Sequence, residues 1–130
     1  MKNLHYYIVC FFAWSLTSFT EFDVYDEVSN AIRSGDSNQL AAFFGTTVDL
    51  TILSKEEVYS KTQAELVLRD FFSKYTPKTF SILHKGSSKE GTLYAIGNMT
   101  TAKGTVFRTS FFLRKSGDKY LIQELRFETE

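Results

Sequence analysis

Apolar side chains recur every three or four positions over residues 22–34, and this spacing predicts an amphipathic helix. The members of its apolar face are Phe22, Val24, Tyr25, Val28 and Ile32. Gly35 follows directly and is a favoured residue for ending a helix. Asp36 can then cap a second, short helix that ends near Gly45.

A period of two replaces the helical period over residues 46–53 and predicts a strand. Val48, Leu50 and Ile52 are the apolar members, so they should share one face of that strand. Residues 55–59 fit either a strand or an irregular segment, and we favour a short strand.

A third helix is expected to start after Ser60, because Ser60 and Gln63 form the spacing of a capping box. Its buried face is expected to contain Ala64, Val67, Leu68, Phe71 and Phe72. The helix should run to about Tyr75, since Pro77 cannot continue it.

From Thr79 to the end, the chain is rich in strand-forming residues and is divided by turn signals at 86–91, 103–104 and 116–118. Short connections between successive strands imply four strands joined as antiparallel hairpins. The predicted elements therefore give an α+β, two-layer architecture, with the helices on one face of the sheet.

The hairpin around Lys103-Gly104 has a preferred register, in which Thr101 pairs with Thr105 and small residues face large ones. The implied pairs are Leu93 with Leu113, Ala95 with Phe111, Gly97 with Thr109 and Met99 with Phe107. In the last hairpin, Leu121, Leu125 and Phe127 should join the same core face as Phe111. That arrangement requires an odd loop, which Ser116-Gly117-Asp118 supplies.

The opposite face of this sheet has more apolar residues than exposure to water requires. Its apolar members are Tyr94, Ile96, Phe112, Tyr120 and Ile122. Its charged members, Arg108 and Arg126 with Glu124 and Glu128, fit cross-strand charge pairs. We expect this outer face to form a homodimer or to bind another protein.

The N-terminus has the pattern of a secretory signal peptide, with Lys2 followed by an apolar run of about nine residues from Tyr6 to Trp14. A spanning helix needs roughly 20 apolar residues. We therefore expect residues 1–20 to be a cleaved signal and the protein to be exported, to the periplasm or the extracellular space. The alternatives are a packed N-terminal helix and an uncleaved anchor. Cys10, the only cysteine, lies within this segment.

The remaining residues, 22–130, have the length of a single domain. The 130-residue sequence holds 15 Lys and Arg against 15 Asp and Glu, and this balance argues against a nucleic acid partner.

The sequence offers few residues for chemistry. We expect no metal site, because the chain after the signal segment has one histidine, His84, and no cysteine. We also expect no cofactor, because no phosphate-binding loop is present. His84 shares strand parity with Phe80 and Ile82, so it could face inward as a general base, or lie half exposed at a strand end. Asp49 could serve as a base in an apolar interior, but the alternation places it opposite Val48 and facing water.

The order of elements resembles the nuclear-transport-factor-2-like (NTF2-like) fold, also called the cystatin-like cone. More narrowly, the chain resembles an uncharacterised family of small secreted bacterial proteins with a domain of unknown function. The segments that carry the resemblance are Phe22-Asp23-Val24, residues 32–36, 40–44, 59–64 and 68–72, and Leu125-Arg126-Phe127-Glu128. The resemblance implies helices packed on one face of a curved antiparallel sheet and does not imply an activity.

The absence of a convincing catalytic set favours an exported, non-catalytic domain that binds a partner protein or a small apolar ligand. The alternative is a cone-pocket enzyme of the isomerase or lyase type, with His84 or Asp49 as general base.

Overall fold

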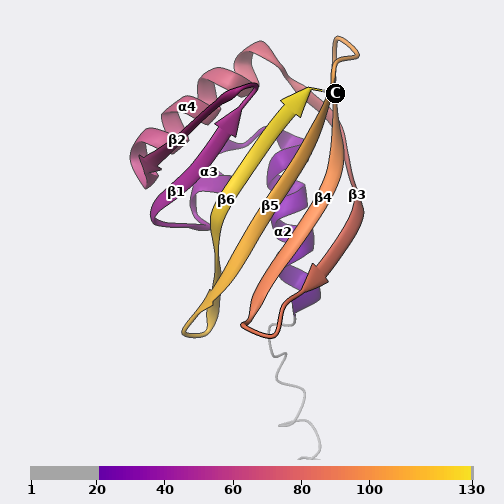
Figure 1. Ribbon diagram of the computed structural model, residues 1–130. Helices are drawn as coiled ribbons and strands as arrows, with labels where there is room; N and C mark the ends of the chain where they lie inside the picture. Colours follow the sequence, from indigo (N-terminus) through magenta and orange to yellow (C-terminus); the bar gives the residue numbers. More distant parts are fainter. Residues whose placement is uncertain (1–20, 130) are drawn as a thin grey trace, which may run out of the picture.

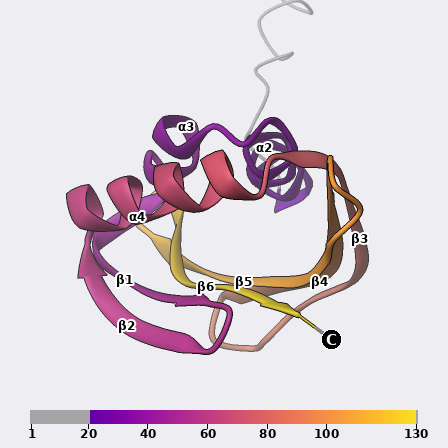
Figure 2. The ribbon, with the colours of Figure 1, turned by 90° about the horizontal axis from the view of Figure 1, so that it is seen from above.

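The computed structural model describes residues 21–129, and in this part of the chain three helices lie on one face of a six-stranded sheet (Figures 1 and 2). The helices are α2 (Glu21–Ser34), α3 (Ser37–Ala41) and α4 (Lys61–Lys74). The strands are β1 (Phe44–Ile52), β2 (Lys55–Ser60), β3 (Pro77–Ser87), β4 (Thr92–Thr101), β5 (Val106–Ser116) and β6 (Lys119–Thr129). None of these helices is long and apolar enough to span a membrane. The expected signal segment, with Cys10, lies outside the described residues.

The helix boundaries follow the capping residues identified in the sequence. Gly35 ends α2 with a φ of +64°, a conformation that favours glycine. Asp36 caps α3 by accepting a hydrogen bond from the backbone N–H of Gln39 at 2.9 Å. Ser60 caps α4 in the same way, accepting from the backbone N–H of Gln63 at 3.3 Å. The short helix α3 ends earlier than expected, because the chain is already extended at Phe44, the first residue of β1.

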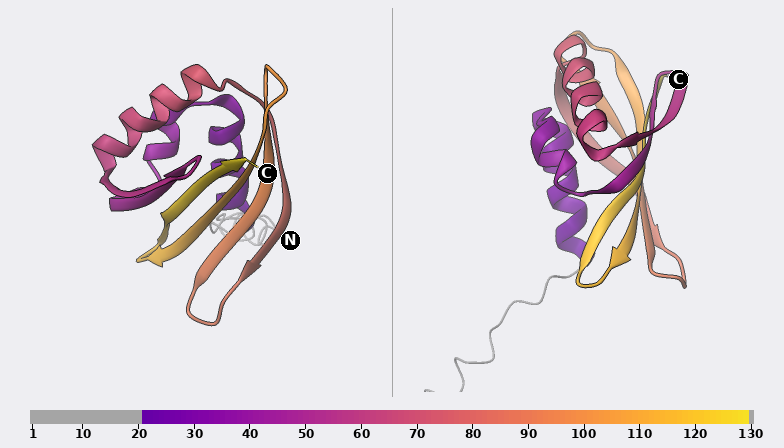
Figure 3. Two further views of the ribbon diagram at one scale, coloured as in Figure 1. Left: turned by 45° about the horizontal axis from the view of Figure 1, so that its top comes forward. Right: turned by 90° about the vertical axis from the view of Figure 1, so that its left-hand side faces the viewer.

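The strands lie in the order β2-β1-β6-β5-β4-β3. All neighbours are antiparallel except β1 and β6, which pair in parallel. The four C-terminal strands therefore form the predicted meander, and the β1–β2 hairpin is added at the β6 edge. The sheet curves toward the helices, so that both of its ends rise beside them (Figures 2 and 3).

The predicted β4–β5 register is confirmed in full. Ala95 lies across from Phe111, Met99 across from Phe107 and Gly97 across from Thr109. The backbone N–H of Thr101 donates to the carbonyl oxygen of Thr105 at 2.8 Å, which closes the hairpin as expected. This face of the sheet is the core face, because Phe107 and Phe111 are fully buried.

The last hairpin differs from the prediction. Its turn has two residues, since Ser116 pairs with Lys119. The third residue of the expected odd count is instead taken up by a bulge at Gln123 in β6, because Phe112 lies across from Glu124 but Leu113 lies across from Ile122. Side chains before the bulge are reversed. Ile122 is therefore 1% exposed and belongs to the core, not to the outer face.

The same reversal places Tyr120 against the core and leaves Leu121 only half-buried, so the expectations for these two residues were wrong as well.

An aromatic cluster fills the space between the helices and the sheet. Phe71 of α4 packs on Phe127 and on Phe107, with ring centroids 4.9 and 5.3 Å apart. Phe72 also packs edge-on against Phe127, with ring centroids 5.8 Å apart. Such offset and edge-on geometries are favourable for aromatic rings.

Candidate functional site

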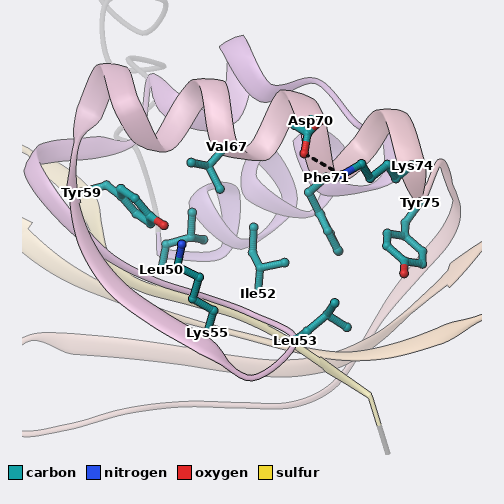
Figure 4. Close-up of a pocket in the computed structure, with 10 residues that line it drawn as sticks. All are labelled: Leu50, Ile52, Leu53, Lys55, Tyr59, Val67, Asp70, Phe71, Lys74 and Tyr75. Atoms are coloured by element: carbon teal, nitrogen blue, oxygen red, sulfur yellow. Dashed lines mark ion pairs between the residues drawn. The ribbon is translucent and has the colours of Figure 1, made fainter.

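A half-open cavity lies between α4 and the β1–β2 hairpin, with a volume of about 240 Å³ (Figure 4). We call it the α4 pocket. Its lining residues are Leu50, Ile52, Leu53, Lys55, Tyr59, Val67, Asp70, Phe71, Lys74 and Tyr75. The floor is apolar, and the charged and hydroxyl-bearing side chains lie around it (Figure 4).

Two simple periodicities place these side chains. In β1, alternation directs Leu50 and Ile52 to the same face, toward α4. In α4, the spacing of Val67, Phe71 and Lys74 puts them on one side of the helix, facing the hairpin. The pocket therefore exists because α4 crosses the hairpin.

Polar groups flank the apolar floor. Burial raises the pKa of the Tyr59 hydroxyl above its ordinary value, and a hydrogen bond with Glu57 and the charge of that carboxylate raise it further. Like any tyrosine hydroxyl, it is protonated at neutral pH. Lys74 Nζ lies 3.2 Å from Asp70 Oδ2, and Lys55 Nζ lies 3.9 Å from Glu57 Oε1. Both lysines are largely exposed, so each can also meet a ligand from solvent.

His84 does not face the interior. Ile82 lies across from Gly97, but His84 lies across from Ile96, because Leu83 forms a bulge in β3. The bulge reverses the parity that linked His84 to Phe80, and His84 is exposed on the outer face. Of the two readings of His84, the inward general base and the exposed strand residue, the structure therefore has the exposed one, and His84 is not among the residues that line the α4 pocket.

Asp49 lies on the outer face of β1, as the alternation predicted, between Val58 of β2 and Glu124 of β6. Its Oδ1 atom is shielded from water and accepts no hydrogen bond from the described residues. Asp49 also does not line the α4 pocket. The two candidate bases thus lie on the far side of the sheet from the cavity.

The expected outer apolar patch is smaller than predicted. Tyr94 and Phe112 lie across from each other there, with ring centroids 6.2 Å apart, and Ile96 lies two positions further along β4. All three side chains are half-buried within the chain itself. Tyr120 and Ile122 are absent from this face because of the β6 bulge.

Charged residues gather on the outer face of β2, β1 and β6 around Arg126. Its Nη2 donates to Glu56 Oε2 at 2.9 Å, and its Nε lies 3.0 Å from Glu124 Oε1 and 3.6 Å from Glu128 Oε1. The hydrogen bond with Glu56 raises the pKa of the guanidinium, burial opposes this, and the charges of the carboxylates raise it further. Arg126 is therefore a permanent cation shared by three carboxylates.

A shallow hollow of about 460 Å³ opens beside Arg126, and we call it the Arg126 hollow. Its lining residues are Thr51, Leu53, Ser54, Glu56, Arg126, Glu128 and Thr129. Within residues 21–129, no group of three or more His, Cys, Asp or Glu is arranged to hold a metal ion.

Sequence reasoning missed most of both cavities. Cross-strand pairs were expected for these charges, but Arg126 pairs with Glu124 and Glu128 of its own strand. Its pairing with Glu56 was not expected, because Glu56 is 70 positions away. Among the residues that line the α4 pocket, Val67 and Phe71 were expected only to pack in the hydrophobic core. The sequence feature that could have indicated a cavity is the pair of tyrosines on either side of α4, Tyr59 and Tyr75. A tyrosine has an apolar ring and a polar hydroxyl, which suits the rim of a cavity.

A family model described as a domain of unknown function, DUF4783, matches residues 25–128. The chain is also similar to crystal structures of DUF4783 family proteins. The protein from Bacteroides ovatus is 26% identical, with a TM-score of 0.75 over 87% of this chain and 96% of that chain. The protein from Bacteroides fragilis is 34% identical, with a TM-score of 0.73 over 80% and 96%. No curated protein matches.

More distant structures share the fold alone. An NTF2-like design with a long sheet is 19% identical and has a TM-score of 0.68, over 83% of this chain and 99% of that chain. A de novo designed protein with a curved β-sheet is 12% identical, with the same TM-score over 83% and 98%. The α+β, NTF2-like cone expected from the sequence is therefore confirmed.

Proposed function

Since the chain belongs to the DUF4783 family of domains of unknown function, we propose a function from its own geometry: it is a non-catalytic binding domain. The ligand is a small, mainly apolar molecule with an anionic end, held in the α4 pocket. The observation that carries this proposal is the apolar lining of Leu50 and Ile52 from β1 and Val67 from α4, with two lysines and a tyrosine around it (Figure 4).

The size of the pocket limits the ligand. A cavity of about 150 Å³ lined by Leu, Ile and Phe is large enough for benzene, and drug-sized ligands use about 300–1,000 Å³. The α4 pocket, at about 240 Å³, therefore suits a single ring or a short branched chain. Phe71, one of the lining residues, is itself packed on Phe107 and Phe127 of the core.

Two lysines at the rim can meet an anion. Lys55 and Lys74 border the pocket, and their acidic partners Glu57 and Asp70 form only exposed ion pairs with them. A ligand carboxylate can compete for such pairs, since they contribute about 1 kcal/mol or less. The Tyr59 hydroxyl, which is hydrogen-bonded to Glu57, can donate to the same group if it exchanges that carboxylate for the ligand's.

The cone-pocket enzyme remains an alternative reading, but its proposed bases do not support it. General base catalysis requires the base within hydrogen-bond reach of the reacting proton. Neither His84 nor Asp49 lines the α4 pocket.

The test is a titration of the chain with 4-phenylbutyrate, in which the NMR shifts of the Val67 and Tyr59 amides report binding. We expect saturable binding, weakened up to about fivefold when 4-phenylbutanol replaces the carboxylate. Val67→Trp should fill the pocket and abolish binding. Leu66→Trp is the matched control, because Leu66 is 55% exposed on the same helix and does not line the pocket. Equal binding by both tryptophan variants would refute the site.

A second candidate function is self-association through the outer sheet face. The paired rings of Tyr94 and Phe112 support it, because they bring aromatic surface together on a face that no helix covers (Figure 2). Phe112→Asp should convert a dimer into a monomer in sedimentation equilibrium. A wild-type monomer, or a dimer that survives this substitution, would exclude this interface.

We further propose that the domain works outside the cytoplasm, in the periplasm or the extracellular space. This rests on the signal-like pattern of residues 1–20.

A further inference from the structure

We propose that the Arg126 hollow is a second binding site, on the opposite face of the sheet from the α4 pocket, and that it takes an alkylammonium group. The cation could belong to a free amine or to a lysine side chain of another protein. The chemistry that would recognise it is the same in both cases.

Charge is the first argument. Asp49, Glu56, Glu124 and Glu128 bring four carboxylates to this region, and the guanidinium groups of Arg126 and of Arg108, which lies across from Glu128, offset two of them. The region therefore keeps a formal charge of −2. Arg126 alone cannot neutralise its three partners, so a further cation is favoured there.

The second argument is an unused polar group. Thr51 is only 5% exposed, it lines the hollow, and its Oγ1 has no hydrogen-bond partner among the described residues. A buried hydroxyl without a partner costs free energy, and most buried polar atoms in proteins are paired. Thr51 Oγ1 is shielded from water, so a ligand donor in the hollow would supply the missing hydrogen bond once the Thr51 side chain turns toward it.

The lining groups match the donors of an ammonium ion. An alkylammonium has three N–H donors and no acceptor. The carboxylates of Glu56 and Glu128 and the hydroxyl of Thr51 are three acceptors around the hollow. Glu56 bonds Arg126 through Oε2, which leaves its Oε1 available. Leu53, which is 41% exposed at the rim, offers an apolar contact for the alkyl chain.

The experiment is an NMR titration of the isotope-labelled chain with n-butylammonium at about 0.15 M salt, where weak long-range attraction is screened. We expect saturable shifts of the Thr51, Glu56 and Glu128 amides. Neutral n-butanol and magnesium ion should not reproduce them. N-acetyl-lysine methylamide is the second arm: binding of both probes fits a protein lysine as the source, and binding of butylammonium alone fits a free amine.

Three variants test the assigned residues. Glu56→Gln and Glu128→Gln should each weaken binding about two- to fivefold, as expected for exposed ion pairs. Thr51→Val, which keeps the volume and removes the hydroxyl, should also weaken it. Glu57→Gln is the matched control, because Glu57 is adjacent to Glu56 and does not line the hollow. Absence of saturation, or an equal loss in the control, would overturn the proposal.

Discussion

Phe111 lies directly across from Ala95 in the β4–β5 ladder, and both side chains are completely buried beneath the helices. The small partner leaves room for the ring, which also packs beside Tyr25 of α2 with centroids 6.5 Å apart. This pairing joins the middle of the sheet to the first helix.

Phe111→Ala should therefore lower the free energy of unfolding by about 3–5 kcal/mol, as truncation of large aromatics in packed cores does. Urea denaturation measures it. Phe112→Ala is the control, because Phe112 is only half-buried on the other face and should cost clearly less. Equal losses would mean that the inner and outer faces of β5 are not distinguished energetically.

Gly97 should not tolerate a side chain. A Cβ at this position would overlap the backbone carbonyl oxygen of Ser81, and β3 would have to move. We expect Gly97→Ala to destabilise the fold by about 1–3 kcal/mol, the usual cost of overpacking. Gly45→Ala is the control, since its Cβ would meet Leu121 at an ordinary contact of 3.7 Å. A thermal melt that is unchanged for Gly97→Ala would contradict the close approach of β3 and β4.

We expect the ionisation of Tyr59 to lower the stability of the fold at high pH. Its folded pKa is raised by burial and by Glu57, so the unfolded chain releases this proton first, at about pH 10. The stabilisation is complete below that pH and is lost as the pH rises through the folded pKa. Tyr59→Phe should therefore show a shallower alkaline decline in unfolding free energy than the wild type.

The ionisation of Tyr59 can also be followed directly, by near-ultraviolet absorbance of the wild type against Tyr59→Phe. Glu57→Gln should move this ionisation toward the ordinary value for tyrosine, because it removes the negative charge and weakens the hydrogen bond. A difference spectrum that already titrates like free tyrosine in the wild type would disprove the effect.

Cleavage of the N-terminal segment is expected between Thr17 and Glu21, because the apolar run from Tyr6 to Trp14 has the length of a signal core. N-terminal sequencing of protein recovered from the periplasm or the medium would locate the cleavage. An intact Met1 on soluble cytoplasmic protein would exclude export by this route.

Most of the local structure followed from short-range patterns in the sequence. Gly35, Asp36 and Ser60 marked helix ends because capping depends on one or two neighbouring residues. The β4–β5 register followed from matching small residues to large ones across a short turn, which needs only about 20 consecutive residues. The core face of β4 and β5, the hairpin order and the fold class were predictable for the same reason.

The functional surfaces depended on information that no short segment contains. The bulges at Leu83 in β3 and at Gln123 in β6 each reverse the side chains of a strand, and they removed His84 from the interior and Ile122 from the outer face. Neither bulge has a glycine or proline at that point to mark it in the sequence.

By itself, the sequence determined the elements, their caps and the buried face of β4 and β5, because each depends on hydrophobic period and on neighbours along the chain. Only the tertiary structure decided where the cavities lie. The α4 pocket needs α4 laid across the β1–β2 hairpin, and the Arg126 hollow needs β1 and β6 side by side, which brings Glu56 within 2.9 Å of Arg126 from 70 positions away. Such contacts form because burying the shared core brings distant strands together, and that pairing leaves no periodic trace in either strand alone.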